Sequence, residues 1–109
     1  MLVLFDNGTP RTLARFLIDH HMVTETRARG WHELENGDLL NAAEAAGFEV
    51  LVTTDKNLSY QQNLSGRRIA IVVLGKGRWS LIRPHVSAVV AAVNAATPGS
   101  FVEVEIPFA

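Results

Sequence analysis

The sequence predicts an α/β domain, because apolar runs of strand length alternate along the chain with segments of helical periodicity. Residues 2–5, 49–53 and 69–74 are short and almost wholly apolar, as expected of strands that are covered on both faces. The segments between them include stretches with apolar residues every three or four positions, which is typical of amphipathic helices. This alternation favours a mostly parallel sheet of about five strands with helices on both of its faces.

The other elements follow from local signals. Thr9 and Pro10 predict the start of the first helix, since a hydroxyl residue followed by proline is typical of a helix N-terminus. Gly47 marks the end of the second helix. The remaining expected elements are, in order, a short strand, a loop, that second helix, a polar stretch with one helical turn, a long helix and a strand with one solvent-facing side: residues 22–26, 27–37, 38–46, 56–68, 81–96 and 101–106.

Length and composition narrow the class of protein. The chain has 109 residues, which fits a single domain over residues 1–109, and its 48% hydrophobic content is enough for a core. It contains no cysteine, which excludes disulfides and thiolate zinc sites and fits a cytoplasmic location. The apolar N-terminal run is too short for a signal peptide, so we expect no membrane association. The net charge of -1 means that a role with nucleic acid would depend on local charge.

Three aspartates are expected at one edge of the sheet. Asp6 follows the first strand, Asp55 lies two residues past the third, and Asp38 opens the helix after the second. Ligands of open α/β sheets bind at the carboxyl ends of the strands, and clustered carboxylates suit Mg²⁺ or Mn²⁺. Such a metal polarises a phosphodiester and lowers the pKa of a bound water. Taken singly, Asp38 could instead favour the helix dipole, and the other two could form turns.

Short motifs in the chain resemble those of PIN-like domains, over about residues 2–74. That family shows Asp-Asn near its start, then Asp-x-x-Ile/Leu-x-x-x-Ala, then Thr-x-Asp-x-Asp-Phe. Asn57 stands where the family has its second aspartate and Leu58 where it has phenylalanine, and the early glutamate of the family has only Glu25 and Glu35 as candidates. The matching residues are Phe5, Asp6, Asn7, Pro10 and Leu13, then Asp38, Leu39, Leu40 and Ala43, then residues 50–58, Val-Leu-Val-Thr-Thr-Asp-Lys-Asn-Leu.

The resemblance implies a three-layer PIN-like fold and a catalytic site. It makes Asp6, Asp38 and Asp55 the ligands of Mg²⁺ or Mn²⁺. It makes Thr53 a hydroxyl that orients Asp55 or a water, and Asn7 an amide beside the ligands or the substrate. The implied activity is that of an endoribonuclease, the toxin of a type II toxin–antitoxin pair. An RNA substrate, a small antitoxin protein and a homodimer are the corresponding expected partners.

Four basic residues are expected at the same edge of the sheet. Arg11 lies in the first turn of the first helix, Lys56 follows Asp55, and Lys76 and Arg78 follow the fourth strand. A positive collar around an acidic centre would bind the phosphate backbone of a nucleic acid. The same residues could instead lie in solvated loops.

Two other functions compete with a nuclease. A PIN-like domain without its second aspartate, here Asn57, could be a catalytically impaired module that only binds a protein partner. A phospho-receiver-like domain also has an aspartate at the end of a strand, but that class has paired acidic residues there. Asp6 is followed by Asn7, which disfavours the receiver interpretation.

Overall fold

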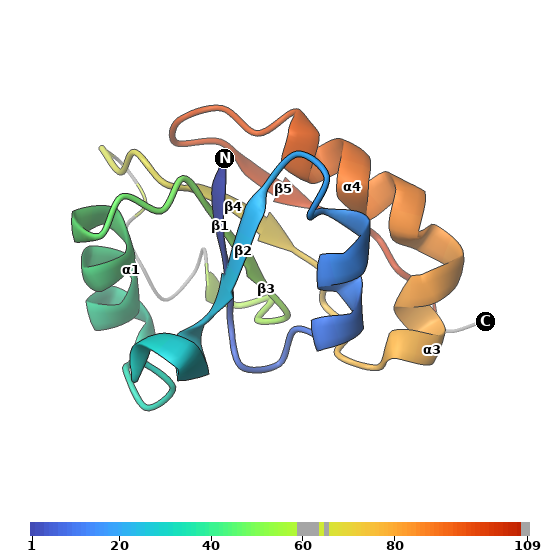
Figure 1. Cartoon of the computed structure of the whole chain (residues 1–109), viewed down its shortest axis with the longest axis horizontal. Coiled ribbons are helices and arrows are strands. Elements are labelled where there is room, and N and C mark those ends of the chain that lie inside the picture. Colours follow the sequence, from blue (N-terminus) through green and yellow to red (C-terminus); the bar gives the residue numbers. More distant parts are fainter. Residues whose placement is uncertain (59–63, 65, 108–109) are drawn as a thin grey trace.

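A five-stranded, all-parallel sheet forms the centre of the protein in the computed structural model, which describes residues 1–58, 64 and 66–107 (Figure 1). The predicted parallel sheet is thus confirmed. The order of the strands across the sheet is β2-β1-β3-β4-β5. The strands are β1 (Leu2–Phe5), β2 (Met22–Glu25), β3 (Val50–Thr53), β4 (Ala70–Val73) and β5 (Phe101–Glu103).

Helical segments connect the strands, as the alternating pattern predicted. In the part of the chain that the structure describes, none of them is long and apolar enough to cross a membrane. The polar stretch 56–68, where one helical turn was expected, lies partly outside the described residues. The described segments are the 3-10 helix η1 (Arg11–Phe16), the 3-10 helix η2 (Thr26–Arg29), α1 (Asn36–Ala45), α3 (Trp79–Ile82), the 3-10 helix η3 (Arg83–His85) and α4 (Val86–Asn94).

Buried side chains of the central strands divide between two hydrophobic clusters, because successive residues of a strand point to opposite faces. One cluster contains Phe5 and Val52 together with residues of η1, α3 and α4. The other contains Leu4 and Leu51 together with Leu39, Leu40 and Ala43 of α1. Figure 1 shows α1 and α4 on either side of the strands. Burial of apolar residues on both faces explains why β1, β3 and β4 are almost continuously apolar.

Several helix boundaries differ from those expected. The first helical segment is a 3-10 helix that begins at Arg11, and the Thr9 hydroxyl donates to the Val52 carbonyl oxygen at 2.9 Å instead of capping it. The predicted helix 81–96 is divided into α3, η3 and α4, with Pro84 inside η3. Proline has no backbone N–H and its ring clashes with the preceding turn, which accounts for the interruption.

The strand order reverses direction at β1. From β1 the chain adds β2 on one side, then crosses back to place β3 on the other. Ligands of open α/β sheets bind outside the carboxyl ends of the strands at such a reversal. The register pairs Phe5 with Val52, and the backbone N–H of Asp6 donates to the Val52 carbonyl oxygen at 3.0 Å. The fold therefore places Asp6 beside the end of β3.

Candidate functional site

One buried hydroxyl joins the two aspartates that follow β1 and β3. Thr53, the last residue of β3, is only 1% exposed. Its Oγ1 donates to Oδ2 of Asp6 at 2.9 Å and accepts from the backbone N–H of Asp55 at 3.1 Å. Because both contacts use the same oxygen atom, Thr53 fixes the position of Asp6 relative to Asp55. The structure thus brings together three of the residues that the sequence singled out.

Both carboxylates also contact the backbone of their own loops. Oδ1 of Asp6 accepts from the N–H of Asn7 at 2.8 Å, and Oδ1 of Asp55 accepts from the N–H of Asn57 at 2.9 Å. These are the turn contacts that the structural interpretation of the aspartates anticipated. A carboxylate oxygen has two lone pairs, so a turn contact leaves capacity for a second partner on the same atom. The turn role is therefore compatible with a ligand role.

Asn36 is a site residue that the sequence analysis missed. Its Nδ2 donates to Oδ2 of Asp55 at 3.0 Å. Asn36 is the first residue of α1, and it shares one face of that helix with the buried Leu39 and Ala43, three and seven positions later. This spacing was a usable signal. Counted back from those two residues, the motif Asp-x-x-Leu-x-x-x-Ala begins at residue 36, where this chain has asparagine.

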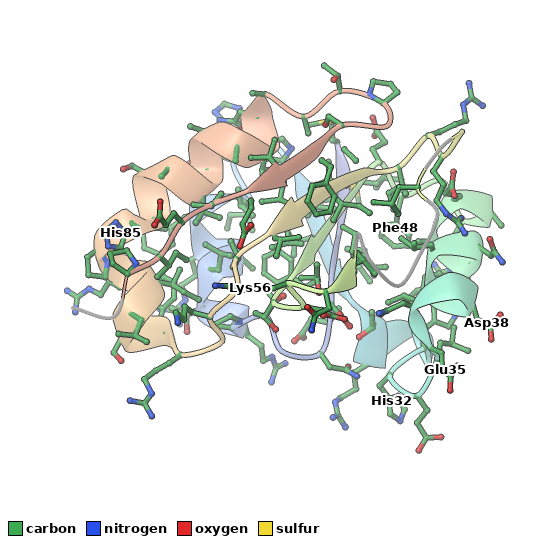
Figure 2. The ribbon with its side chains drawn as sticks, turned by 180° about the vertical axis from the view of Figure 1, so that it is seen from behind. His32, Glu35, Asp38, Phe48, Lys56 and His85 are labelled. Carbon is green, nitrogen blue, oxygen red and sulfur yellow. The ribbon has the colours of Figure 1, made fainter. Side chains whose placement is uncertain are left out.

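Asp38 lies on the other side of α1 from Asn36. Successive residues are about 100° apart around the helix axis, so Asn36 and Asp38, two positions apart, are separated by about 200°. Asp38 is exposed, and Figure 2 shows it on the outer side of the helix, away from the centre of the sheet edge. Within residues 1–58, 64 and 66–107, no three histidine, cysteine or acidic residues gather where they could hold a metal ion. The expected cluster of three aspartates is therefore not formed in this part of the chain, because Asp38 lies on the outer face of α1.

Glu25 and Glu35, the candidates for the early glutamate of the PIN-like family, lie outside the group formed by Asp6, Thr53, Asp55 and Asn36. Glu25 ends β2 and pairs with Arg11 at 3.1 Å. Glu35 immediately precedes α1 and is exposed, and Figure 2 shows it near Asp38 at the end of that helix.

Asn7 connects three segments of the chain. Its Nδ2 donates to the carbonyl oxygen of His32 at 2.6 Å, and its Oδ1 accepts from Oγ1 of Thr26 at 2.8 Å. Thr26 is 1% exposed, so this second contact is anchored in the protein interior. The contacts hold the loop after β1 against the segment that leads into α1. Asn7 therefore helps to position Asn36.

The basic residues lie around this site. Arg11 pairs with Glu25, and Nζ of Lys56 is 4.0 Å from Oε1 of Glu103. Lys76 and Arg78 lie in the loop between β4 and α3. The two pairs are largely solvent-exposed, and exposed ion pairs contribute about 0–1 kcal/mol. Such pairs are weak enough for an anionic ligand to replace the glutamate.

The loops after β1 and β3 approach each other very closely at this edge. A Cβ atom on Gly8 would lie 2.4 Å from Oγ1 of Thr54, which is closer than non-bonded atoms can be. A larger residue at this position would force the Thr54 side chain to rotate or the loops to separate, so the small size of Gly8 permits the close approach. The close approach helps to hold Asp6 near Asp55.

A clear pKa shift occurs at Glu44, in α1 away from the candidate site. Burial raises the pKa of the Glu44 carboxyl. Hydrogen bonds from the Arg68 backbone N–H and the Arg67 guanidinium, together with the Arg67 charge, lower this pKa by more than burial raises it. The pKa consequently lies below its ordinary value. This ion pair ties the segment before β4 to α1 and has a structural role.

No protein family, curated protein or solved structure matches the chain significantly. The structure shows an α/β protein with a five-stranded, all-parallel sheet. Its candidate site consists of Asp6, Thr53, Asp55 and Asn36, at the edge where the strand order reverses.

Proposed function

We propose that this chain is a single, three-layer PIN-like domain that acts as a Mg²⁺- or Mn²⁺-dependent endoribonuclease. The observation that carries the proposal is the pair of carboxylates, Asp6 and Asp55, fixed by one buried threonine at the reversal of strand order. Paired oxygen donors at that edge suit a hard cation and a phosphate ester. The two hydrophobic clusters, one with α1 and one with α4, support the layered arrangement.

Two carboxylates are sufficient for the proposed metal. Mg²⁺ usually keeps several waters and is bound by one or two carboxylates together with substrate phosphates. Asp6 and Asp55 would supply the carboxylates, and Asn36 would hold Asp55 in position through its amide. Asp38 is not among the ligands of this proposal, because it lies on the outer side of α1.

The chemistry follows from these positions. When bound, the cation supplies polarisation of the scissile phosphate and a more acidic water. Thr53 keeps the two carboxylates aligned by donating to Asp6 and accepting from the Asp55 backbone. Arg11, Lys56, Lys76 and Arg78 would contact the phosphates of the RNA backbone and position the strand.

The proposed biological setting rests on the resemblance to PIN-like domains. It is that of a cytoplasmic toxin of a type II toxin–antitoxin pair, neutralised by a small antitoxin protein. A homodimer is part of the same proposal. Co-expression with the product of a neighbouring small reading frame, followed by co-purification, tests this setting separately from catalysis.

Cleavage of RNA tests the activity. Purified protein with Mg²⁺ or Mn²⁺ is expected to cut single-stranded RNA, and EDTA is expected to stop it. Asp55→Ala should abolish cleavage, whereas Asp38→Ala, a matched removal of an exposed carboxylate, should leave most of it. Cleavage that survives EDTA or Asp55→Ala would contradict the proposal.

A second function is favoured by Asn36 itself. An amide donor occupies Oδ2 of Asp55, where a third carboxylate of a metal site would place another negative charge. The neutral amide gives the Asp55 carboxylate a partner within the protein, which suits a catalytically impaired module that binds a protein. A wild-type protein that is inert on several RNAs with either metal, yet binds a partner tightly, would favour this function.

A further inference from the structure

A cavity of about 370 Å³ lies beside the candidate site. It is bounded by residues that follow β3, β4 and β5, and Lys56, on its wall, comes directly after Asp55 in the chain. The cavity combines two basic, two acidic and several apolar side chains. They include Lys56, Lys76, Glu103, Glu105, Leu74 and Ile106.

The carbon chain of Lys56 has a defined position on this wall. It lies against Gly75, whose φ is +72°, a conformation that side chains rarely adopt. A Cβ atom on Gly75 would lie 2.2 Å from Cε and 3.1 Å from Cγ of Lys56. The absence of a side chain at Gly75 therefore makes room for the lysine. The ammonium group of Lys56 is therefore carried by a side chain whose carbon atoms pack against Gly75.

Among the described residues, the ammonium of Lys56 forms one loose ion pair. Nζ is 4.0 Å from Oε1 of Glu103, and the two side chains are 54% and 51% exposed. Arg11 and Glu25 are closer, at 3.1 Å. A distant pair in solvent contributes little, so another anion can take the place of Glu103. Phosphate oxygens are well suited to a lysine that acts as a point charge.

We infer that this cavity is a subsite for an RNA phosphate next to the scissile one, and that Glu103 weakens the subsite by competing for Lys56. Glu103 ends the edge strand β5, so the fold itself places the competitor at the cavity. The identification of the anion as RNA rests on the proposed function. The competition between Glu103 and a phosphate for Lys56 does not require catalysis.

Binding of a short labelled single-stranded RNA, followed by fluorescence anisotropy in EDTA, tests the inference without cleavage. Glu103→Gln is expected to tighten binding about two- to fivefold, the range that loss of an exposed ion pair can produce. The control Asp19→Asn changes the net charge by the same amount, but Asp19 lies in the turn before β2, at the other edge of the sheet from β5. Salt screens charges that are far apart, so its effect on binding should be smaller than about twofold.

Lys56→Gln shows whether Glu103 acts through the lysine. This variant should weaken binding and reduce the salt dependence by about 0.7, the slope for one phosphate contact on a single strand. In the Lys56→Gln background, Glu103→Gln should have no larger effect than Asp19→Asn, because the competed ammonium group is gone and only the change in net charge remains. Inorganic pyrophosphate that displaces the labelled RNA as effectively as unlabelled RNA does, at the same concentration of phosphate groups, would overturn the assignment to an RNA strand.

The outcomes separate this inference from the nuclease proposal. Tighter binding by Glu103→Gln in a protein that never cuts RNA would support the subsite and contradict the nuclease. Metal-dependent cleavage together with equal binding by Glu103→Gln and Asp19→Asn would overturn the subsite and support the nuclease. A Glu103 effect of undiminished size in the Lys56→Gln background would also overturn the subsite.

Discussion

Asn36→Asp moves a carboxylate to the place where α1 meets the candidate site. In the wild type, the Asn36 amide donates to Oδ2 of Asp55 at 3.0 Å. The variant replaces this donor with a third negative charge next to Asp6 and Asp55. We expect the variant to be less stable than the wild type in EDTA and to respond more strongly to Mg²⁺ or Mn²⁺.

The size of the effect follows from the distance between the two side chains. A hydrogen bond to a charged acceptor contributes about 1.5–3 kcal/mol, and that contribution is lost. Two like charges about 4 Å apart repel by about 4 kcal/mol at an effective dielectric constant of 20 and by about 1 kcal/mol in water. Asn36 and Asp55 are both half-buried and can rotate apart. The net loss should therefore be about 2–4 kcal/mol, a decrease in Tm on the order of 10 °C for a small domain.

Thermal unfolding with and without metal measures this prediction. The control is Asn36→Asp combined with Asp38→Asn, which keeps the net charge while moving one carboxylate from the outer side of α1 to the inner side. At the same metal concentration both variants should gain more stability than the wild type, and a concentration of about 100 times the Kd of a variant should stabilise that variant by about 2.7 kcal/mol. Asp38→Asn alone should behave as the wild type. An Asn36→Asp protein that is as stable as the wild type in EDTA, with an unchanged metal response, would refute the reasoning.

Two further substitutions test the site and the fold. Asp6→Asn weakens a charge-assisted hydrogen bond with Thr53 but relieves repulsion by Asp55, so the free energy of unfolding in EDTA should stay within about 1 kcal/mol of wild type. The metal-induced rise in Tm should disappear, and a retained rise would contradict the role of Asp6 as a metal ligand. Glu44→Gln should lower the free energy of unfolding at pH 7, because the native pKa of Glu44 is depressed and its carboxylate is stabilising above the ordinary value of about 4.3. The difference from wild type in urea unfolding should shrink as the pH falls through the native pKa of Glu44, and a difference that stays constant with pH would contradict the linkage.

The parallel sheet was predictable from the sequence because burial on both faces requires nearly continuous apolar strands. Residues 2–5, 49–53 and 69–74 agree with β1, β3 and β4 to within one residue at each end. Asp6 and Asp55 could be placed at the same edge for the same reason, since the carboxyl ends of parallel strands share it. This part of the site follows from topology alone.

The third member of the site depended on where α1 begins. The inner face of the helix, with Leu39, Leu40 and Ala43, agrees with the one expected, but the start was expected at Asp38 and the helix begins at Asn36. Asn36 therefore occupies the inward position in the first turn, about 200° around the helix from Asp38. The buried positions Leu39 and Ala43 carried the information needed to choose Asn36.

Contacts between distant segments could not be read from the sequence. The hydroxyl of Thr9 donates to the Val52 carbonyl oxygen instead of capping a helix, although this oxygen already accepts from the Asp6 N–H, and Asn7 contacts the segment before α1. These choices depend on which polar groups the fold brings close together. Local preferences describe short stretches and cannot rank such tertiary alternatives.

Titration of the protein with Mn²⁺, observed through paramagnetic broadening of backbone NMR signals, tests the proposed metal site most directly. The account predicts a saturable site at which the signals of Asp6, Thr53, Asp55 and Asn36 broaden first. The signals of Asp6, Thr53 and Asn36 should persist in Asp55→Ala, and in the wild type those of Asp38 should be affected later. Broadening that begins elsewhere, such as around Glu103 and Glu105, or that never saturates, would contradict metal binding by Asp6 and Asp55.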